Sequence, residues 1–180
     1  GDGITDVLRS GARFECFFNH RDPAKAWRRT RYVRRQGLAA FPDVDFSDPS
    51  LAYGVLSWQI EYSTALKLFN YPDKAAPEGG KLQPEGATGF PVISKDGKTY
   101  TFTVKSGFKS NTGETLTAAN FSAAIDRVLN PKMQSPAVPF VTGDNGIVGA
   151  QAVADGKATH ASGVVAKGQK LTIRLQKPDG

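Results

Sequence analysis

The stretch 90–105 limits the possible folds most strongly, because it has the pattern of a β-hairpin. Two runs rich in β-branched and aromatic residues, 90–94 and 99–105, flank an Asp96-Gly97 pair. An Asp-Gly pair between such runs is the strongest short-range signal for a hairpin turn. In the second run Tyr100, Phe102 and Val104 alternate with polar residues, which predicts an antiparallel strand with one buried and one solvated face.

A second hairpin is expected near the end of the chain. The run 162–166 is joined through Lys167-Gly168-Gln169 to 170–176, where Leu171, Ile173 and Leu175 alternate with polar neighbours. Neither hairpin belongs to a parallel strand–helix–strand rhythm. We therefore predict an α+β fold in which antiparallel hairpins pack with helices.

One predicted helix lies between these hairpins and begins after Thr117. The threonine is suited to cap the helix, although Asn120 occupies the position at which a capping box favours Glu or Gln. Asn130-Pro131 should end it, which makes Leu129 its last buried residue. The apolar stripe expected to be buried consists of Phe121, Ala124, Ile125, Val128 and Leu129.

A longer helix is predicted within 43–70. Asp48 is suited to cap its first turn and Pro49 to follow the cap. The helix should run from Leu51 to Phe69, and Gly54 is a point at which it could divide. The residues at three- and four-residue steps, which we expect to face the core, are Leu51, Val55, Trp58, Tyr62, Ala65, Leu66 and Phe69.

The connecting segments carry helix-breaking residues. The stretch 70–80 is expected to be a surface loop, and 132–149 an irregular segment rich in Gly and Pro. A single helical turn is expected over 150–154, closed by Asp155-Gly156.

The positive charge is concentrated at the start of the chain. Residues 1–40 hold 9 Lys and Arg against 4 Asp and Glu, whereas 41–180 hold 14 against 13. Five arginines within 28–35, with Trp27 and Tyr32 among them, fit a nucleic-acid patch, but we favour a solvated basic face or a linker. We treat 1–29 as a separate basic segment of unknown role.

The motifs of metal and catalytic sites are missing from the sequence. A single cysteine, Cys16, excludes an internal disulfide, and His20 and His160 are expected to be ordinary surface residues. Asp43, Asp45 and Asp48 could suggest a cation site, but a calcium loop needs a Gly and a Glu that are not in place. We therefore favour a turn whose carboxylates bond its own backbone and cap the helix, and we predict neither a cofactor nor enzymatic activity. Tyr53, Trp58 and Tyr62 could line a ligand cleft, or they could belong to the core.

From about Arg31 onwards the chain resembles the family 5 extracellular solute-binding proteins, the peptide- and nickel-binding components of ABC importers. The matching stretches, in order, are 48–53, 97–109, 113–121, Arg127-Val128-Leu129-Asn130-Pro131 and Ile147-Val148-Gly149-Ala150. The chain departs from the family pattern at 110–112 and at Asn120, which are details of a loop and a cap.

This resemblance implies a two-lobed periplasmic-binding-protein fold of type II. Residues 30–180 would form the incomplete first lobe, and the chain is expected to be an excised piece. By analogy the stretch 48–58 contributes one rim of the cleft, and we predict Asp48, Tyr53 and Trp58 as ligand-binding residues.

The implied role is a monomeric, extracytoplasmic receptor for peptides or similar small solutes, which serves an ABC permease and does not bind nucleic acid. The alternative that we keep open is a regulatory or nucleic-acid-binding protein that uses the basic front end.

Overall fold

A computed structural model describes residues 16–17 and 44–179 of the chain. Four features of the sequence therefore lie outside the described residues: the basic run within 28–35, His20, Asp43 and the proposed separate segment 1–29. The short strand β1 (Cys16–Phe17) is the described part of that segment. Within this described part, no helix is long and apolar enough to cross a membrane.

Both predicted hairpins are present, and they join into one sheet. β5 (Val92–Ile93) pairs with β6 (Thr99–Thr103), and β7 (Val164–Lys167) pairs with β8 (Lys170–Arg174), all antiparallel. The sheet has the order β5-β6-β8-β7, because β6 also pairs with β8. Gly97 and Gly168 have φ of 67° and 56° in the two turns, a conformation that glycine adopts without steric cost. The predicted buried faces are confirmed: Tyr100, Phe102, Val104, Leu171, Ile173 and Leu175.

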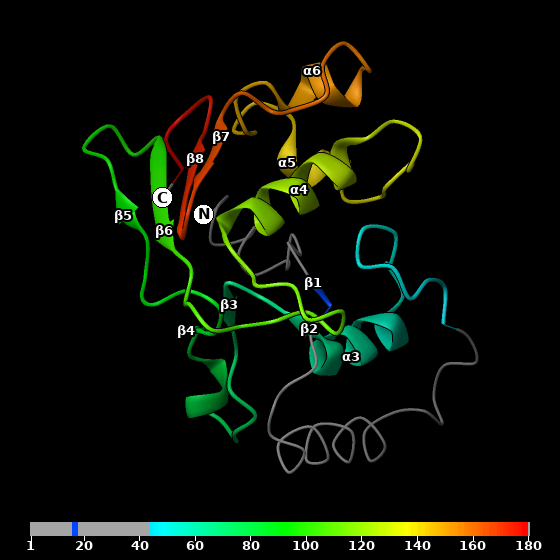
Figure 1. The fold of residues 1–180 in the computed structure, drawn as a ribbon, viewed down its shortest axis with the longest axis vertical. Coiled ribbons are helices and arrows are strands. Elements are labelled where there is room, and N and C mark those ends of the chain that lie inside the picture. The colour runs from blue at the N-terminus through cyan, green and yellow to red at the C-terminus, as the bar shows by residue number, and fades with distance from the viewer. Residues whose placement is uncertain (1–15, 18–43, 180) are drawn as a thin grey trace.

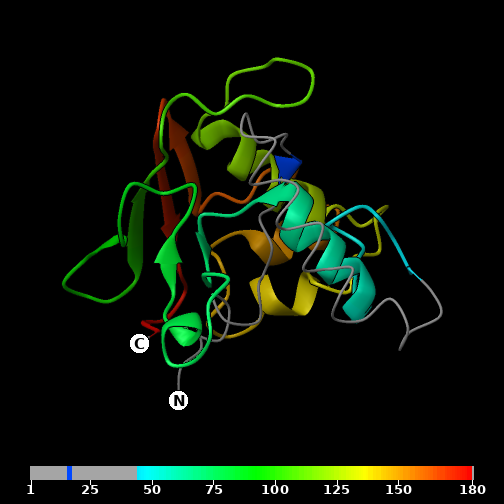
Figure 2. The ribbon, with the colours of Figure 1, turned by 90° about the horizontal axis from the view of Figure 1, so that it is seen from below.

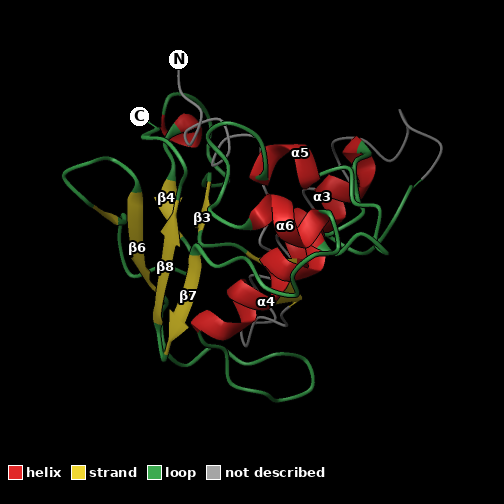
Figure 3. Cartoon of the chain, turned by 90° about the horizontal axis from the view of Figure 1, so that it is seen from above, coloured by secondary structure: helices red, strands yellow, loops and turns green. Residues whose placement is uncertain are grey.

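Helix α4 (Ala118–Leu129) covers one face of this sheet and has the predicted limits. The Thr117 hydroxyl accepts from the Ala119 amide, and the Asn120 side chain accepts from the Thr117 amide at 2.9 Å, so Asn completes the capping box. Phe121, Ile125 and Leu129 are fully buried, whereas Ala124 is only partly buried. Figures 1 and 3 show the sheet on one side of the molecule and α4 to α6 gathered on the other.

The longer predicted helix is shorter than expected and buries a different face. Helix α3 spans Val55–Thr64, and its buried residues are Leu56, Ser57 and Glu61, while Val55 is 47% exposed. The apolar residues at the end of the predicted stripe are buried in two short strands instead. β2 (Ala65–Leu66) pairs with β1, and β3 (Phe69–Asn70) pairs with β4 (Gln83–Pro84). Pairing with distant segments therefore replaces the last predicted turns of the helix.

The remaining segments largely follow the expectations. The loop predicted over 70–80 starts after Asn70, the last residue of β3, and is irregular except for a 3-10 turn, η1 (Glu78–Gly80). The predicted short helix is α6 (Ala150–Ala154). Within the segment predicted to be irregular, α5 (Val138–Val141) forms one turn, with Pro139 in the first turn where its missing N–H costs nothing. In Figures 1 and 2, α3 lies farther from the four-stranded sheet than α4 does.

Candidate functional site

The carboxylate of Asp45 organises the start of α3. It accepts hydrogen bonds from the amides of Tyr53 at 2.7 Å and Gly54 at 2.6 Å, and also from the Ser57 hydroxyl. Burial works to raise the pKa of Asp45, but the Ser57 hydroxyl and the backbone amides outweigh it and lower the pKa to about 2. Asp45, not Asp48, therefore supplies the carboxylate at the helix start, where it bonds the two residues before Val55 and the side chain of Ser57.

Gly54 makes this arrangement possible. A Cβ atom at this position would lie 3.1 Å from Oδ1 of Asp45, which is closer than most side chains can approach without a shift. The extended backbone of Gly54, with φ of −72° and ψ of 143°, then leads into Val55 as the first helical residue. Gly54, at which the helix was predicted to divide, is instead the residue just before the helix begins.

The aromatic residues predicted to bind ligand lie together at this helix start. The rings of Tyr53 and Trp58 are in edge contact, with centroids 5.7 Å apart and planes at 75°. The indole N–H of Trp58 donates to the carbonyl of Ala52 at 3.1 Å, which fixes the ring against the turn. Tyr53 is 56% exposed, and the neighbouring Phe46 and Val55 are also exposed. The segment thus presents an apolar, aromatic surface to solvent.

Asp48 is part of a different contact. Its carboxylate forms an ion pair with Arg127 of α4 and accepts from the Ser50 amide at 2.9 Å. Burial works to raise the pKa of Asp48, and the hydrogen bond and charge of Arg127 bring it below the ordinary range. The structure therefore contradicts the prediction that Asp48 caps the helix: it closes the turn 48–52 and ties that turn to α4.

A buried hydrogen bond holds the same turn from a second side. The Ser135 hydroxyl, in the loop after α4, donates to the carbonyl of Ser50, and both serines are buried. Because the segment 44–54 contains little regular structure, these contacts with Arg127 and Ser135 define its position relative to α4. The sequence predicted that the carboxylates of this turn, Asp45 among them, bond its own backbone, and Asp45 does so. It gave no signal for the contacts of Arg127 and Ser135, since their partners are distant in the chain.

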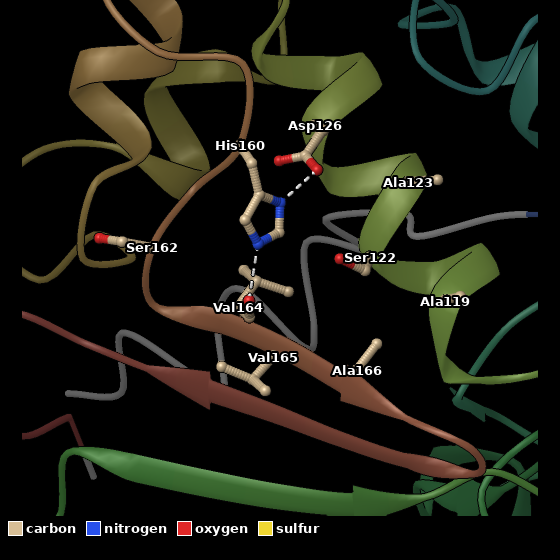
Figure 4. A pocket seen from close by; sticks show the side chains of 9 residues that line it. All are labelled: Ala119, Ser122, Ala123, Asp126, His160, Ser162, Val164, Val165 and Ala166. Carbon is tan, nitrogen blue, oxygen red and sulfur yellow. Dashed lines mark hydrogen bonds and ion pairs between the residues drawn. The ribbon is translucent and has the colours of Figure 1, made fainter.

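A groove of about 510 Å³ lies between α4 and β7. Figure 4 shows its walls: Ala119, Ala123 and Asp126 from α4, and Val164, Val165 and Ala166 from β7. His160 closes one end. Nδ1 of its ring lies 2.6 Å from Oδ2 of Asp126, and Nε2 lies 2.9 Å from the carbonyl of Val164.

Neither region has the geometry of a catalytic or metal centre. In the groove, the ring nitrogens of His160 face Asp126 and a backbone carbonyl, so they are not directed at the Ser122 or Ser162 hydroxyl. Across 16–17 and 44–179, no three metal-binding side chains are grouped to hold an ion. Asp45 and Asp48 bond separate partners, as expected for turn and helix contacts, although Asp43 lies outside the described residues.

Comparisons with known proteins agree on one family. Residues 81–180 match the model of the bacterial extracellular solute-binding proteins, family 5. The periplasmic murein peptide-binding protein MppA of Escherichia coli is 35% identical over 133 residues, 73% of this chain, and the dipeptide-binding protein DppE of Bacillus subtilis is 35% identical over 86 residues, 47% of this chain. The solved structure of the pheromone receptor PrgZ covers 75% of this chain with a TM-score of 0.65 and 32% identity. This chain spans 14% of DppE, 23% of MppA and 25% of the PrgZ chain.

Proposed function

The chain belongs to the family 5 bacterial extracellular solute-binding proteins, and on that premise we propose that it is part of a receptor that captures peptides or similar small solutes outside the cytoplasm. The receptor hands its solute to an ABC permease in the membrane, works as a monomer and catalyses no reaction. Support comes from the family match and from relatives whose names refer to dipeptides, murein peptides and a pheromone. The nucleic-acid alternative gains no support from these relatives.

Within that receptor, residues 30–180 form the opening part of the first lobe. The chain corresponds to about a quarter or less of each relative's length, which is consistent with an incomplete lobe. A solute cleft needs two walls, so residues 1–180 alone are expected to bind no solute strongly.

The proposed solute-facing residues are Tyr53 and Trp58. The observation that carries this assignment is the edge-to-face contact of exposed Tyr53 with half-buried Trp58, on a helix start that a carboxylate fixes in place. Rigid aromatic side chains offer a large contact area at low entropic cost, which suits the wall of a peptide cleft. Asp48 belongs to the same site, and its contacts with Arg127 and Ser50 fix the turn from which the aromatic pair projects.

The test is calorimetric titration with synthetic di-, tri- and nonapeptides. The protein is produced from its natural coding sequence, with whatever flanks residues 1–180, and compared with residues 1–180 alone. We expect the natural product to bind at least one peptide class, and Tyr53→Ala and Trp58→Ala to weaken that binding. Val165→Ala removes an exposed apolar side chain from β7 and is the matched control, which should bind normally.

Two outcomes would contradict the proposal. Micromolar peptide affinity in residues 1–180 alone would refute the need for a second wall. Unchanged affinity in both aromatic variants would refute the site, even if the natural product proves to be a peptide receptor.

A further inference from the structure

His160 joins helix α4 to the segment that leads into β7. Its two ring nitrogens contact Asp126 Oδ2 and the Val164 carbonyl, and the other carboxylate oxygen of Asp126 accepts from the Ala161 amide at 3.1 Å. The Ala161 carbonyl in turn accepts from the Val164 amide at 2.9 Å. In Figure 4 the imidazole bridges the end of the groove between these two elements.

Both atoms that face the ring are hydrogen-bond acceptors. A carbonyl oxygen can only accept, so Nε2 must carry a proton to bond Val164. The carboxylate of Asp126 likewise needs a proton on Nδ1. Only the doubly protonated imidazolium satisfies both contacts, because a neutral ring carries one N–H and turns a lone pair toward the remaining acceptor.

Among the described residues that line the groove, Asp126 is the one charged side chain that faces the ring. Helix α4 contributes Asp126 alone, and β7 lines the groove with Val164, Val165 and Ala166. In the segment before His160, Lys157 pairs with Asp155 at 3.0 Å, and the same carboxylate accepts from Gln151. Asp126 is thus the charged group to which the imidazole responds.

We propose that His160 is a pH-sensitive clasp, which fastens the segment 160–164 to α4 when its ring is doubly protonated and releases it when the ring loses a proton. Release frees the carbonyl of Val164 on β7, an outer strand of the sheet, and opens the end of the groove. The device is independent of any solute and stands apart from the proposed transport role.

The direction of the pH dependence follows from the same contacts. The hydrogen bond to Asp126 raises the pKa of His160 above its ordinary value, and partial burial opposes this only in part. Because the folded-state pKa is the higher one, the clasp contributes fully below the unfolded-state pKa of about 6.5. Its contribution is lost as the pH rises through the folded-state value.

The first test is an NMR titration of the imidazole in the unmodified chain. We expect the midpoint of His160 to lie above about 6.5, the value of an unperturbed histidine, and to fall in Asp126→Asn. His20→Gln removes the other histidine, assigns the signals, and should leave the His160 midpoint unchanged. A wild-type midpoint at or below about 6.5, or one that Asp126→Asn does not lower, overturns the proposal.

The second test follows the segment itself by hydrogen exchange at the amides of Ala161 and Val164. The ratio of rates in His160→Gln and wild type cancels the intrinsic dependence of exchange on pH. We expect this ratio to be largest near pH 5 and to approach one near pH 9. Between these limits the ratio should fall by about tenfold for each unit by which folding raises the pKa of His160. A ratio that does not change with pH means that the contact is static and also overturns the proposal.

Discussion

Two regions of the molecule are held by different kinds of contact. One is the entering segment, residues 44–54, which leads into α3, and the other is the layer formed by α4 and the sheet of β5 to β8. Polar side-chain contacts fix the entering segment, through Asp45, Asp48 and the buried Ser135–Ser50 hydrogen bond, while Tyr53 and Val55 stay exposed. The layer is held by fully buried apolar side chains such as Phe121 and Leu171. One region uses polar contacts to present apolar groups to solvent, and the other buries its apolar groups.

This difference predicts which substitutions should lower the stability of the fold and which should affect only the proposed binding surface. Burial of apolar area dominates folding free energy, whereas exposed polar contacts contribute little and act locally. Substitutions in the layer should therefore lower the global free energy of unfolding, and substitutions in the entering segment should loosen that segment alone.

The largest effect is expected from Phe121→Ala in α4. The side chain is fully buried under the sheet, so its loss removes transfer free energy and leaves a cavity, at a cost of about 3–5 kcal/mol. Urea unfolding followed by circular dichroism measures this cost. Phe140→Ala makes the same chemical change at a position that is 41% exposed and should cost less than about 1 kcal/mol. Equal effects at the two positions would contradict the expectation that burial determines the cost of losing a phenyl ring.

An intermediate, local effect is expected from Asp45→Ala. The variant leaves the amides of Tyr53 and Gly54 without their acceptor, a loss comparable to that of a helix cap, about 1–2 kcal/mol. Hydrogen exchange should quicken over 53–58 and stay unchanged in β6 and β8. Asp73→Ala, in an exposed loop, is the control. Faster exchange throughout the sheet would show that the two regions unfold together.

The same carboxylate predicts a response to acid. The pKa of Asp45 is lowered to about 2, below the unfolded-state value of about 3.9, so its contribution is present above about pH 4 and disappears as the pH falls toward 2. Hydrogen exchange over 53–58 should accordingly approach that of Asp45→Ala across this window. A constant difference between wild type and variant would show that the charge of Asp45 is unimportant.

The two regions also differ in how far the sequence alone predicts them. In the layer, the signals are local: the Asp96-Gly97 turn joins adjacent strands, and Thr117 bonds a residue two positions away. The pairing of β6 with β8 was not predicted, because alternation defines the buried face of a strand without naming its neighbour.

In the entering segment the signals were misleading for a physical reason. Residues such as Leu66 and Phe69 continue a helical spacing, yet they are buried in strands whose partners are distant in the chain. Asp48-Pro49 has the composition of a cap, but Asp45 reaches the helix start because the turn 48–52 folds the chain back. The sequence placed Tyr53 and Trp58 in one short stretch, 48–58, so their proximity was expected. The contacts of Arg127 with Asp48 and of Ser135 with Ser50 join segments far apart in the chain, and no local pattern predicts them.

A smaller effect is expected from Arg127→Gln, which breaks the ion pair with Asp48. The Arg127 side chain is 53% exposed and that of Asp48 31% exposed, so solvent screens the pair and its loss should cost less than about 1 kcal/mol. Unfolding at low and high salt should show the difference shrinking as salt is added. Lys81→Gln breaks the more exposed pair with Glu78 and should cost still less. A salt-independent loss would mean that Arg127 acts through packing.

The smallest effect on stability is expected from Tyr53→Ala, at a residue that we assign to the solute site. Its ring is 56% exposed and contacts Trp58 by one edge, so the free energy of unfolding should change by no more than about 0.5 kcal/mol. In a Trp27→Phe background the fluorescence of Trp58 should nevertheless shift, because the neighbouring ring is lost. If Tyr53→Ala instead destabilises the chain as much as Asp45→Ala does, the aromatic pair supports the fold of the entering segment. If Tyr53→Ala leaves stability unchanged, the exposed ring of Tyr53 is free for the solute contact that we propose for it.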